Sequence, residues 1–265
     1  MRARTLLILL LAAFLLTACA PRAPLPQQGD LTIVCTDSFE PLATALTGAF
    51  QERYPHVAVQ VDVRNDANAR GRLEDGKADV ALLAGPLDPL PEGWQQRPLA
   101  LEGLAVVVHP DNSLSEIGLA QTQMVFSGRT VSWDALGGGA GEIQPVSREK
   151  GSAARAAFES GLMRERAITS LAILMPSSTA VVEYVAAHPD AIGYVAAHGA
   201  AGVKMLRVEG SLPTLNAVKQ GTYPLVMTGY LVWGAKPTAE AQVFLDFAAS
   251  PAGRTIIANA GYAVP

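Results

Sequence analysis

The residues best suited to chemistry lie in the stretch SREKGSAARAAFES, residues 147–160. Arg148 precedes a short polar loop, and Ser152 stands where an alanine-rich helix would begin. The first turn of a helix has unpaired N–H groups and a partial positive charge, which together suit an anion. The stretch therefore predicts a small anion site. The alternative is that Ser152 only caps its helix and that Arg148 points into water.

Catalytic and metal-binding chemistry has little support in the sequence. The histidines are scattered, and no HExxH helix, CxxC pair, Walker loop or GxSxG turn occurs. The glycine-rich segment GGGAG at 137–141 lacks the lysine that follows the glycines of a Walker loop, so it is typical of a flexible loop. We therefore expect a protein without catalytic activity, metal or cofactor.

The N-terminus is typical of a secreted bacterial protein. Two arginines precede the apolar run TLLILLLAAFLLTA, which is short for a membrane span. The last three residues of this run and Cys19 form LTAC, positions 16–19, which resembles the bacterial lipobox, in which the cysteine is lipidated and cleavage makes it the new N-terminus. We expect residues 1–18 to be a lipoprotein signal peptide and Cys19 to carry the lipid. An ordinary signal peptide cut near a cysteine is the alternative.

A spacer and a globular body follow Cys19. Residues 19–29 are rich in Pro and Gln, so we expect an extended tether. No later apolar run is long enough to span a bilayer, which predicts an extracytoplasmic protein held to the cell membrane by its lipid, at the cell surface or in a periplasm. The body keeps one cysteine, Cys35, which we expect to be a buried strand residue without a disulfide partner.

The charge of the chain argues against nucleic acid as a partner. The chain has 20 basic and 24 acidic residues, and loss of the signal peptide removes two arginines to leave 18 and 24, a formal charge of −6. That sign favours neither nucleic acid nor an anionic membrane surface. It does not exclude a small anion, because local charges and dipoles govern a buried site.

Apolar runs alternate with helical periodicities along the body and predict an α/β fold with parallel-rich sheets. The expected strands are 31–35, 57–63, 78–85, 101–110, 142–147, 191–195 and 223–233. The expected helices are 39–53, 115–126, one after Ser152, 178–188 and two that close the chain. Asp37 and Glu40 have the spacing of a capping box, with Pro41 in the first turn of the first helix.

Six segments, in this order, resemble the phosphate-binding subgroup of the periplasmic solute-binding proteins, which supply ABC importers. They are GKADVALLAGPL, MVFSGRTVSWDALGG, IQPVSREKGS, HPDAIGYVA, GTYPLVMTGYLVW and FLDFAASPAGRTIIANAGYAVP. The resemblance covers the chain from about residue 30 to its end. It implies the type II periplasmic-binding-protein architecture, in which two α/β domains are joined by two crossover strands and ligand binds in the cleft between them.

The resemblance also implies domain boundaries. Residues 30–108 and 225–265 would form a discontinuous domain I, and residues 109–224 would form domain II. The chain would cross between them near 104–110 and 223–231. Ligands of α/β proteins bind beyond the carboxyl ends of strands, where helices begin, and this general rule agrees with a ligand near Arg148.

Residue by residue, the resemblance implies an anion site on three loops. The expected ligand-binding residues are Thr36, Asp37, Ser38, Asp66, Arg148, Ser152 and Ala153. In the first loop, Asp37 has the alternative role of a helix cap. In the third loop, Arg148 and Ser152 match the family pattern, and Ala153 offers its backbone N–H.

Several positions depart from the family pattern. Asp66, in the second loop NDAN at 65–68, stands near a family serine and would repel an anion unless it is protonated or turned away. Ala84 stands where the family has the aspartate that accepts the proton of hydrogen phosphate. Ala154 lacks the hydroxyl expected at its position. Each lost charge-assisted hydrogen bond costs roughly 1.5–3 kcal/mol, so a different ligand or a degenerate site stays open.

The favoured hypothesis is a monomeric, lipid-anchored solute-binding protein that delivers phosphate or another small oxyanion to ABC permease subunits. The alternative is a ligand sensor or scaffold of the same fold that takes no part in transport. A hydrolase is the least favoured hypothesis.

The lipobox generates a prediction about anchoring. In Cys19→Ser the hydroxyl cannot accept the lipid, so we expect the protein to leave membrane fractions or to accumulate as an uncleaved precursor. Fractionation and intact mass measure both outcomes. A wild-type protein that is fully soluble and carries no lipid mass would contradict the prediction.

Overall fold

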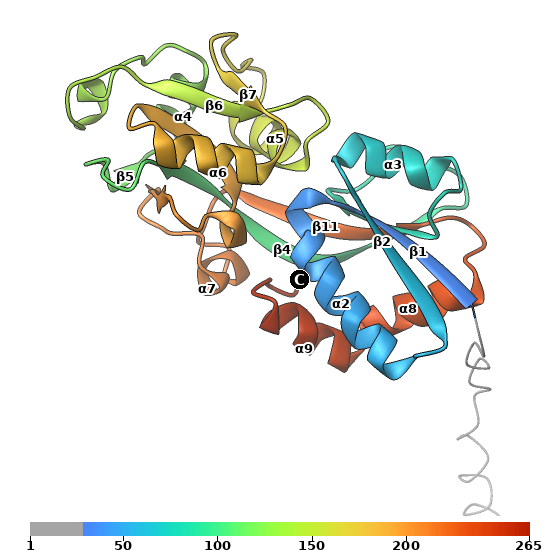
Figure 1. Cartoon of the computed structure of the whole chain (residues 1–265). Helices are drawn as coiled ribbons and strands as arrows, with labels where there is room; N and C mark the ends of the chain where they lie inside the picture. The colour runs from blue at the N-terminus through green and yellow to red at the C-terminus, as the bar shows by residue number, and fades with distance from the viewer. Residues whose placement is uncertain (1–28) are drawn as a thin grey trace, which may run out of the picture.

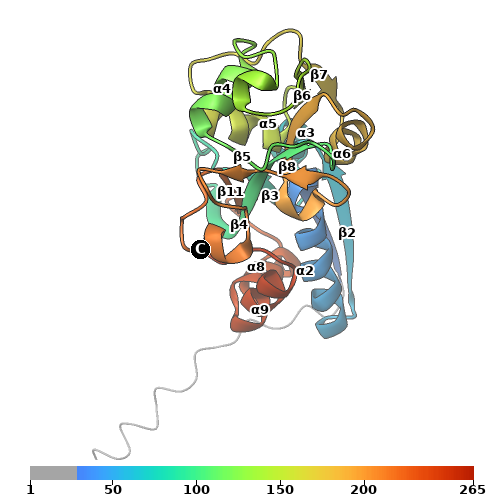
Figure 2. The same ribbon diagram turned by 90° about the vertical axis from the view of Figure 1, so that its left-hand side faces the viewer.

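The computed structural model describes residues 29–265, which form two α/β lobes (Figure 1). The predicted signal peptide, the lipidation site Cys19 and almost all of the predicted tether lie outside the described residues, and Gly29 already belongs to the first strand. Figure 2 shows one lobe above the other, with strands running from one to the other. Within residues 29–265 no helix combines the length and apolar composition that a membrane crossing needs.

Lobe I is a sheet with the strand order β2-β1-β3-β11-β4 and helices on both faces. Strands β1, β2 and β3 are parallel, and β11 runs antiparallel to both of its neighbours. Its elements are β1 (Gly29–Thr36), the 3-10 turn η1 (Asp37–Phe39), α2 (Glu40–Arg53), β2 (Val57–Arg64), α3 (Asp66–Glu74), β3 (Val80–Ala84), residues 95–103 of β4 (Gln95–Val108), β11 (Val226–Trp233), α8 (Ala239–Ala249) and α9 (Pro251–Asn259).

Lobe II continues the sheet with the order β4-β8-β6-β7. Strands β8, β6 and β7 are parallel, and β4 is antiparallel to β8. Its elements are residues 104–108 of β4, β5 (Glu116–Ile117), α4 (Leu119–Phe126), the 3-10 turn η2 (Asp134–Leu136), β6 (Gln144–Arg148), α5 (Ala153–Phe158), the π-helical turn η3 (Glu159–Met163), β7 (Ile173–Met175), α6 (Ser178–Ala187), β8 (Ala191–Ala196), the 3-10 turn η4 (Ala197–Gly199), β9 (Lys204–Met205), β10 (Arg207–Val208) and α7 (Leu215–Lys219).

One long strand, β4, joins the lobes. Its first part pairs with β11 as far as Gly103, and its second part pairs with β8 from Leu104 onward. The chain returns just before β11, where the Leu104 N–H donates to the carbonyl of Leu225 at 2.8 Å. The first crossing, at residues 103–104, therefore falls at the start of the expected range 104–110, and the second, at Leu225, falls within the expected range 223–231.

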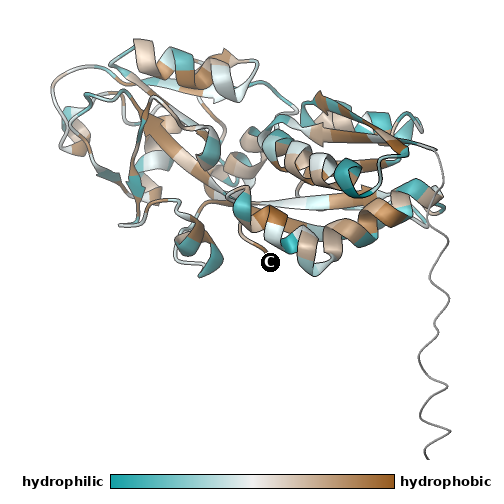
Figure 3. Ribbon diagram, turned by 60° about the horizontal axis from the view of Figure 1, so that its bottom comes forward, coloured by the Kyte–Doolittle hydropathy of each residue, from teal (hydrophilic) through white to brown (hydrophobic). Residues whose placement is uncertain are grey.

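Burial on both faces explains the continuous apolar strands. In β1, Ile33 and Cys35 pack on the α2 and α8 side of the sheet, whereas Val34 packs on the α3 side. Successive side chains of a strand point to opposite faces, so a sheet covered on both faces needs apolar residues at every position. Figure 3 shows this distribution, with mostly apolar central strands and polar residues concentrated in helix ends and loops. The expected burial of Cys35 is confirmed, and burial raises its pKa to about 12.

Three local expectations were wrong, each for a physical reason. The helix expected over 115–126 begins only at Leu119, because Glu116–Ile117 pairs with β10. The expected loop 65–68 is the first turn of α3, because the Asn65 side chain caps that helix through the N–H of Asn68. The capping box does not form: Phe39 is the N-cap of α2 and makes no side-chain cap bond. Asp37 is engaged elsewhere, as described below.

An aromatic cluster forms the centre of lobe II. The ring of Phe158 stacks on Tyr194 with centroids 4.0 Å apart and lies 4.6 Å from the ring of Phe126. All three side chains are fully buried. Phe158 ends α5, so this packing holds the helix that follows the Arg148 loop against the sheet.

This cluster generates a stability prediction. Phe158→Ala leaves a cavity that the stacked rings cannot fill, so we expect the free energy of unfolding to fall by about 3–5 kcal/mol. Leu171→Ala is the matched control, because that side chain is 76% exposed and its loss should change stability by less than about 0.5 kcal/mol. Urea unfolding of both variants provides the measurement. Equal midpoints would contradict a central role for the cluster.

Candidate functional site

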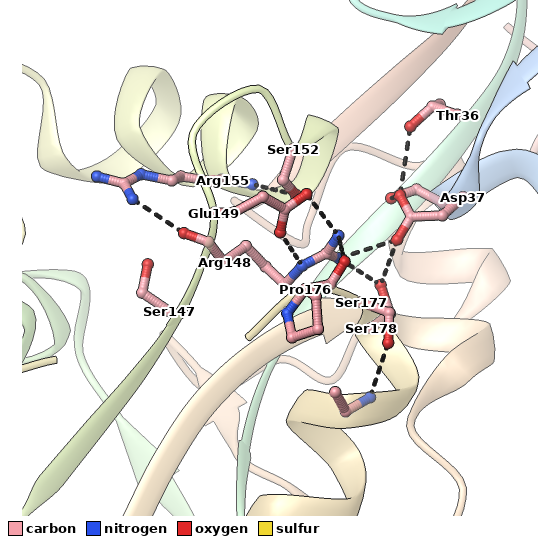
Figure 4. Close-up of polar contacts among 12 residues, drawn as sticks. Thr36, Asp37, Ser147, Arg148, Glu149, Ser152, Arg155, Pro176, Ser177 and Ser178 are labelled. Carbon is pink, nitrogen blue, oxygen red and sulfur yellow. Dashed lines mark hydrogen bonds and ion pairs between the residues drawn. The ribbon is translucent and has the colours of Figure 1, made fainter. Parts of the chain in front are cut away.

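The polar residues of both lobes converge where strands end and helices begin. In lobe I this edge contains the end of β1 with η1, and the step from β2 to α3. In lobe II it contains the loop from β6 to α5 and the step from β7 to α6. The carboxyl ends of parallel strands meet at the same edge of a sheet, which is the usual ligand position in α/β proteins. Figure 4 shows the side chains of this edge.

Arg148 is the central side chain of the site, and it is only 1% exposed. Its Nη1 lies 2.9 Å from Asp37 Oδ2, an ion pair that joins the two lobes, and its Nε lies 3.0 Å from Glu149 Oε2 (Figure 4). Nη1 also donates to Ser178 Oγ at 2.9 Å, and Nη2 donates to the carbonyl of Pro176 at 3.4 Å. A buried guanidinium needs such partners, because an unpaired buried charge costs several kcal/mol. Of the two alternatives for Arg148, the one that points it into water is therefore excluded.

The hydroxyls around Asp37 make weaker contacts. Thr36 Oγ1 and Ser38 Oγ lie 3.4 Å and 3.5 Å from Asp37 Oδ1, and Ser178 Oγ lies 3.3 Å from Oδ2. Thr36 and Ser38 are buried, whereas the Asp37 side chain is 21% exposed. Distances at the limit of hydrogen bonding indicate hydroxyls that can turn to another acceptor.

Ser152 caps the helix that follows it. Its hydroxyl accepts from the N–H of Arg155 at 3.4 Å, and Ser152 and Ala153 are fully buried. The Arg155 side chain donates to the carbonyl of Arg148 at 2.9 Å and pairs with Glu159, so the loop is held from both ends. The structure thus places Arg148 beside Asp37, and it gives Ser152 a capping role within lobe II.

The lobes also touch through backbone at this loop. The N–H of Ala67, in the first turn of α3, donates to the carbonyl of Gly151 at 3.2 Å. Gly151 has φ +90°, and a Cβ there would lie 3.0 Å from the Cβ of Ala67. Glycine is required at this position by its backbone conformation, and it also permits the close approach of the two lobes.

Asp66, in the first turn of α3, is turned toward the end of β3. Its Oδ1 accepts from the N–H of Ala84 at 2.9 Å. Burial is the main cause that raises its pKa from 3.8 to about 6, and the charge of Asp37 adds to the shift, whereas the Ala84 N–H and Arg70 oppose it. Asp66 therefore links the second loop to Ala84, the position at which the resemblance implies a proton-accepting aspartate.

An open hollow of about 420 Å³ lies between the lobes beside the ion pair. Its lining residues come from both lobes: Asp37, Val63, Arg64, Asn65, Arg148, Glu149, Pro176 and Ser177. Arg64 is the second cation that lines this hollow. It is half exposed and pairs with Asp62. Arg70 instead pairs with Glu74 on the surface of α3.

Two contributors were missed in the sequence. Glu149 directly follows Arg148, and Ser178 begins α6 after strand β7. A serine at a strand-to-helix step is the same signal that singled out Ser152, so Ser178 could have been found. The pairing of Asp37 with Arg148 could not, because 111 positions separate them and only the packing of the lobes joins them.

The described residues 29–265 include no group of three or more His, Cys, Asp or Glu side chains that could hold a metal ion. The convergent groups are one guanidinium, two carboxylates and several hydroxyls. Such a set can bind a small polar ligand through charge and hydrogen bonds.

Comparisons with known proteins agree with the architecture. A model of the PBP superfamily domain matches residues 20–252, so the chain belongs to this superfamily of binding-protein domains. It is 26% identical, over 284 aligned positions, to "Phosphate-binding protein PstS" of Bacillus subtilis, with 98% of this chain and 93% of the relative covered. The expected resemblance to phosphate-binding-type periplasmic solute-binding proteins and the expected two-domain fold are confirmed.

Solved structures extend the comparison to transport and regulatory proteins. A putative phosphate ABC transporter substrate-binding protein with bound phosphate from Clostridium perfringens has a TM-score of 0.83 at 23% identity and covers 89% of this chain and 99% of its own. The regulatory domain of CcmR from Synechocystis, in complex with 2-PG, has a TM-score of 0.62 at 18% identity and covers 83% of this chain and 95% of its own. At these identities both show the fold alone.

Asp66 generates a pH prediction for stability. Its pKa is higher in the folded than in the unfolded chain, so the folded state binds more protons between about pH 4 and 6, and stability falls as the pH rises through this window. A shift from 3.8 to about 6 corresponds to at most ~3 kcal/mol. We expect Asp66→Asn, which keeps an acceptor for the Ala84 N–H, to lose this dependence.

The measurement is urea unfolding of wild type and Asp66→Asn at pH 4.5 and pH 7. Asp134→Asn is the control, because that side chain is exposed and forms no ion pair within the described residues, so the variant should keep the wild-type pH dependence. A stability difference between wild type and Asp66→Asn that is the same at both pH values would contradict the assigned shift.

Proposed function

We propose that this protein is an extracytoplasmic, lipid-anchored receptor that binds a small oxyanion between its lobes and delivers it to an ABC importer. The observation that carries the proposal is Arg148, a guanidinium only 1% exposed at the edge where both lobes meet. A solute-binding role agrees with the similarity to phosphate-binding proteins. The lipid on Cys19, the permease partner and the monomeric state are parts of this proposal.

The donors around Arg148 suit an oxyanion. The planar guanidinium can hold two oxygens of one ligand, which an ammonium group cannot do. The hydroxyls of Thr36, Ser38 and Ser178 lie within 3.5 Å of the Asp37 oxygens, and they can turn to an anion that takes that place. The hollow beside them provides an entry for a ligand the size of phosphate.

Selectivity should differ from that of a phosphate binder with a proton-accepting aspartate. Ala84 has no side-chain acceptor, and Asp66 is bonded to the N–H of Ala84. The site therefore has no dedicated acceptor at that position for the proton of hydrogen phosphate. We expect weak discrimination between protonated and fully ionised oxyanions.

A sensor or scaffold without transport is the second candidate. It is favoured by the two carboxylates beside Arg148, which depart from a simple anion site, and it is compatible with a fold shared with regulatory domains such as that of CcmR. Neighbouring genes for a permease and an ATPase would favour transport. Their absence together with ligand binding would favour the sensor.

A ligand panel tests the binding part of the proposal. Phosphate, sulfate, molybdate, tungstate and small organic anions are added singly in a thermal-shift assay. A ligand at 100 times its dissociation constant stabilises the folded state by about 2.7 kcal/mol, which gives a clear shift of the melting temperature. The proposal fails if none of these anions shifts the melting temperature.

Arg148 generates the mutational prediction. Arg148→Lys keeps the charge and loses the planar fork, so we expect the affinity for the panel's best anion to fall at least about tenfold, and Arg148→Ala to abolish binding. Arg148→Ala also leaves the Asp37 and Glu149 carboxylates without their cation, so it should lose about 3–5 kcal/mol of stability. Calorimetry on the lysine variant is therefore decisive.

Arg129→Ala, an exposed arginine in the same lobe, is the matched control and should bind as wild type does. Circular dichroism confirms folding of each variant before calorimetry. Unchanged affinity in Arg148→Lys would place the ligand away from this guanidinium.

A further inference from the structure

We propose that the Asp37 carboxylate is a built-in competitor for the oxyanion position on Arg148, and that the same ion pair holds the two lobes together. Asp37 would thus set both the affinity for external anions and the closure of the cleft. The competition half of this inference rests on the proposed function, whereas the latching half depends only on contacts within the protein.

The contacts of Asp37 match those of an oxygen of a bound oxyanion. Its Oδ2 receives Arg148 Nη1 at 2.9 Å and Ser178 Oγ at 3.3 Å, and both donors belong to lobe II. Asp37 itself belongs to lobe I, directly after β1. One carboxylate oxygen therefore joins the lobes as a ligand oxygen would in a closed cleft (Figure 4).

The other carboxylate oxygen of Asp37, Oδ1, contacts hydroxyl donors of its own lobe. Oδ1 has the hydroxyls of Thr36 and Ser38 at 3.4 Å and 3.5 Å. The Asp37 carboxylate thereby engages both the Arg148 guanidinium and the hydroxyls that an external anion would need. A ligand that binds Arg148 must therefore break these contacts and displace Asp37.

The charge balance points the same way. Arg148 already faces two carboxylates, since Glu149 Oε2 lies 3.0 Å from its Nε. An anion that joined this group without displacing Asp37 would meet more negative than positive charge, and like charges at contact distance repel. Displacement has a route, because Asp37 and Arg148 both line the open hollow between the lobes.

The lack of a side-chain cap bond at the start of α2 supports the role of Asp37 as a partner of Arg148. The sequence predicted Asp37 as a helix cap, yet the N-cap of α2 is Phe39, which makes no side-chain cap bond, and Asp37 lies in the 3-10 turn before it. The charged contact with a buried guanidinium is formed in place of a cap bond. The carboxylate of this loop is thus directed across the cleft.

Calorimetry with inorganic phosphate at pH 7 tests the competition. The full-length protein is compared with Asp37→Asn and Asp37→Ser, with Asp111→Asn as an exposed control. We expect both Asp37 variants to bind phosphate at least tenfold more tightly than wild type, and the control to bind as wild type does. If the asparagine variant folds poorly, tighter phosphate binding by the serine variant alone supports the competition.

Small-angle scattering in phosphate-free buffer tests the latch and needs no ligand. We expect wild type and the control to be compact, Asp37→Asn to have a larger radius of gyration, and Ser178→Ala, which removes the weaker of the two donors to Oδ2, to change less. Added phosphate should return Asp37→Asn to the compact form.

The outcomes separate this inference from the proposed function. Phosphate binding by wild type with equal or weaker binding by both Asp37 variants would keep the proposed function and overturn the competitor. Phosphate binding by an Asp37 variant but not by wild type would support the role of Asp37 as a competitor. Absence of phosphate binding in every variant would overturn the competition half, while the ligand panel still decides whether other oxyanions bind. Identical scattering of wild type and Asp37→Asn in phosphate-free buffer would overturn the latch.

Discussion

The buried guanidinium of Arg148 is the constraint on which the rest of the site depends. A cation that is 1% exposed must be neutralised by neighbouring groups, and here two carboxylates, a hydroxyl and a backbone carbonyl do so. One of the carboxylates, Asp37, comes from the other lobe. Neutralising Arg148 therefore also fixes how the lobes meet. The burial of this charge and the closure of the cleft depend on the same ion pair.

The architecture makes this arrangement possible because one strand belongs to both lobes. Pairing of β4 changes from β11 to β8 at residues 103–104, so both halves of the sheet present the carboxyl ends of parallel strands toward the same cleft. Side chains after β1, β6 and β7 then meet although they lie far apart in the chain. The Gly151 and Ala67 contact shows that the backbones also approach closely there. Small residues at this point let the charged groups come together.

The same fold carries transport receptors and regulatory domains, so fold similarity does not choose between them. The cleft of this chain combines Ala84, at a position where the resemblance implies a carboxylate, with Asp66 turned to the Ala84 N–H and Asp37 on Arg148. A phosphate site of the kind that the resemblance implies has its negative charge at a different place.

Local rules sufficed for most of the fold and for the identity of the key residue. Apolar runs located the strands, because strands buried on both faces have no alternative composition, and the helix–loop pattern at 147–160 singled out Arg148 and the capping Ser152. Boundaries shifted where pairing at a distance overrode propensity, as at Glu116–Ile117. The partner of Arg148 was decided only by tertiary structure. Asp37 has a plausible local role as a cap, and nothing near it in the chain reveals a buried cation from another lobe. Long-range electrostatics chose the ion pair over the cap because a buried charge without a partner costs more than a missing cap bond.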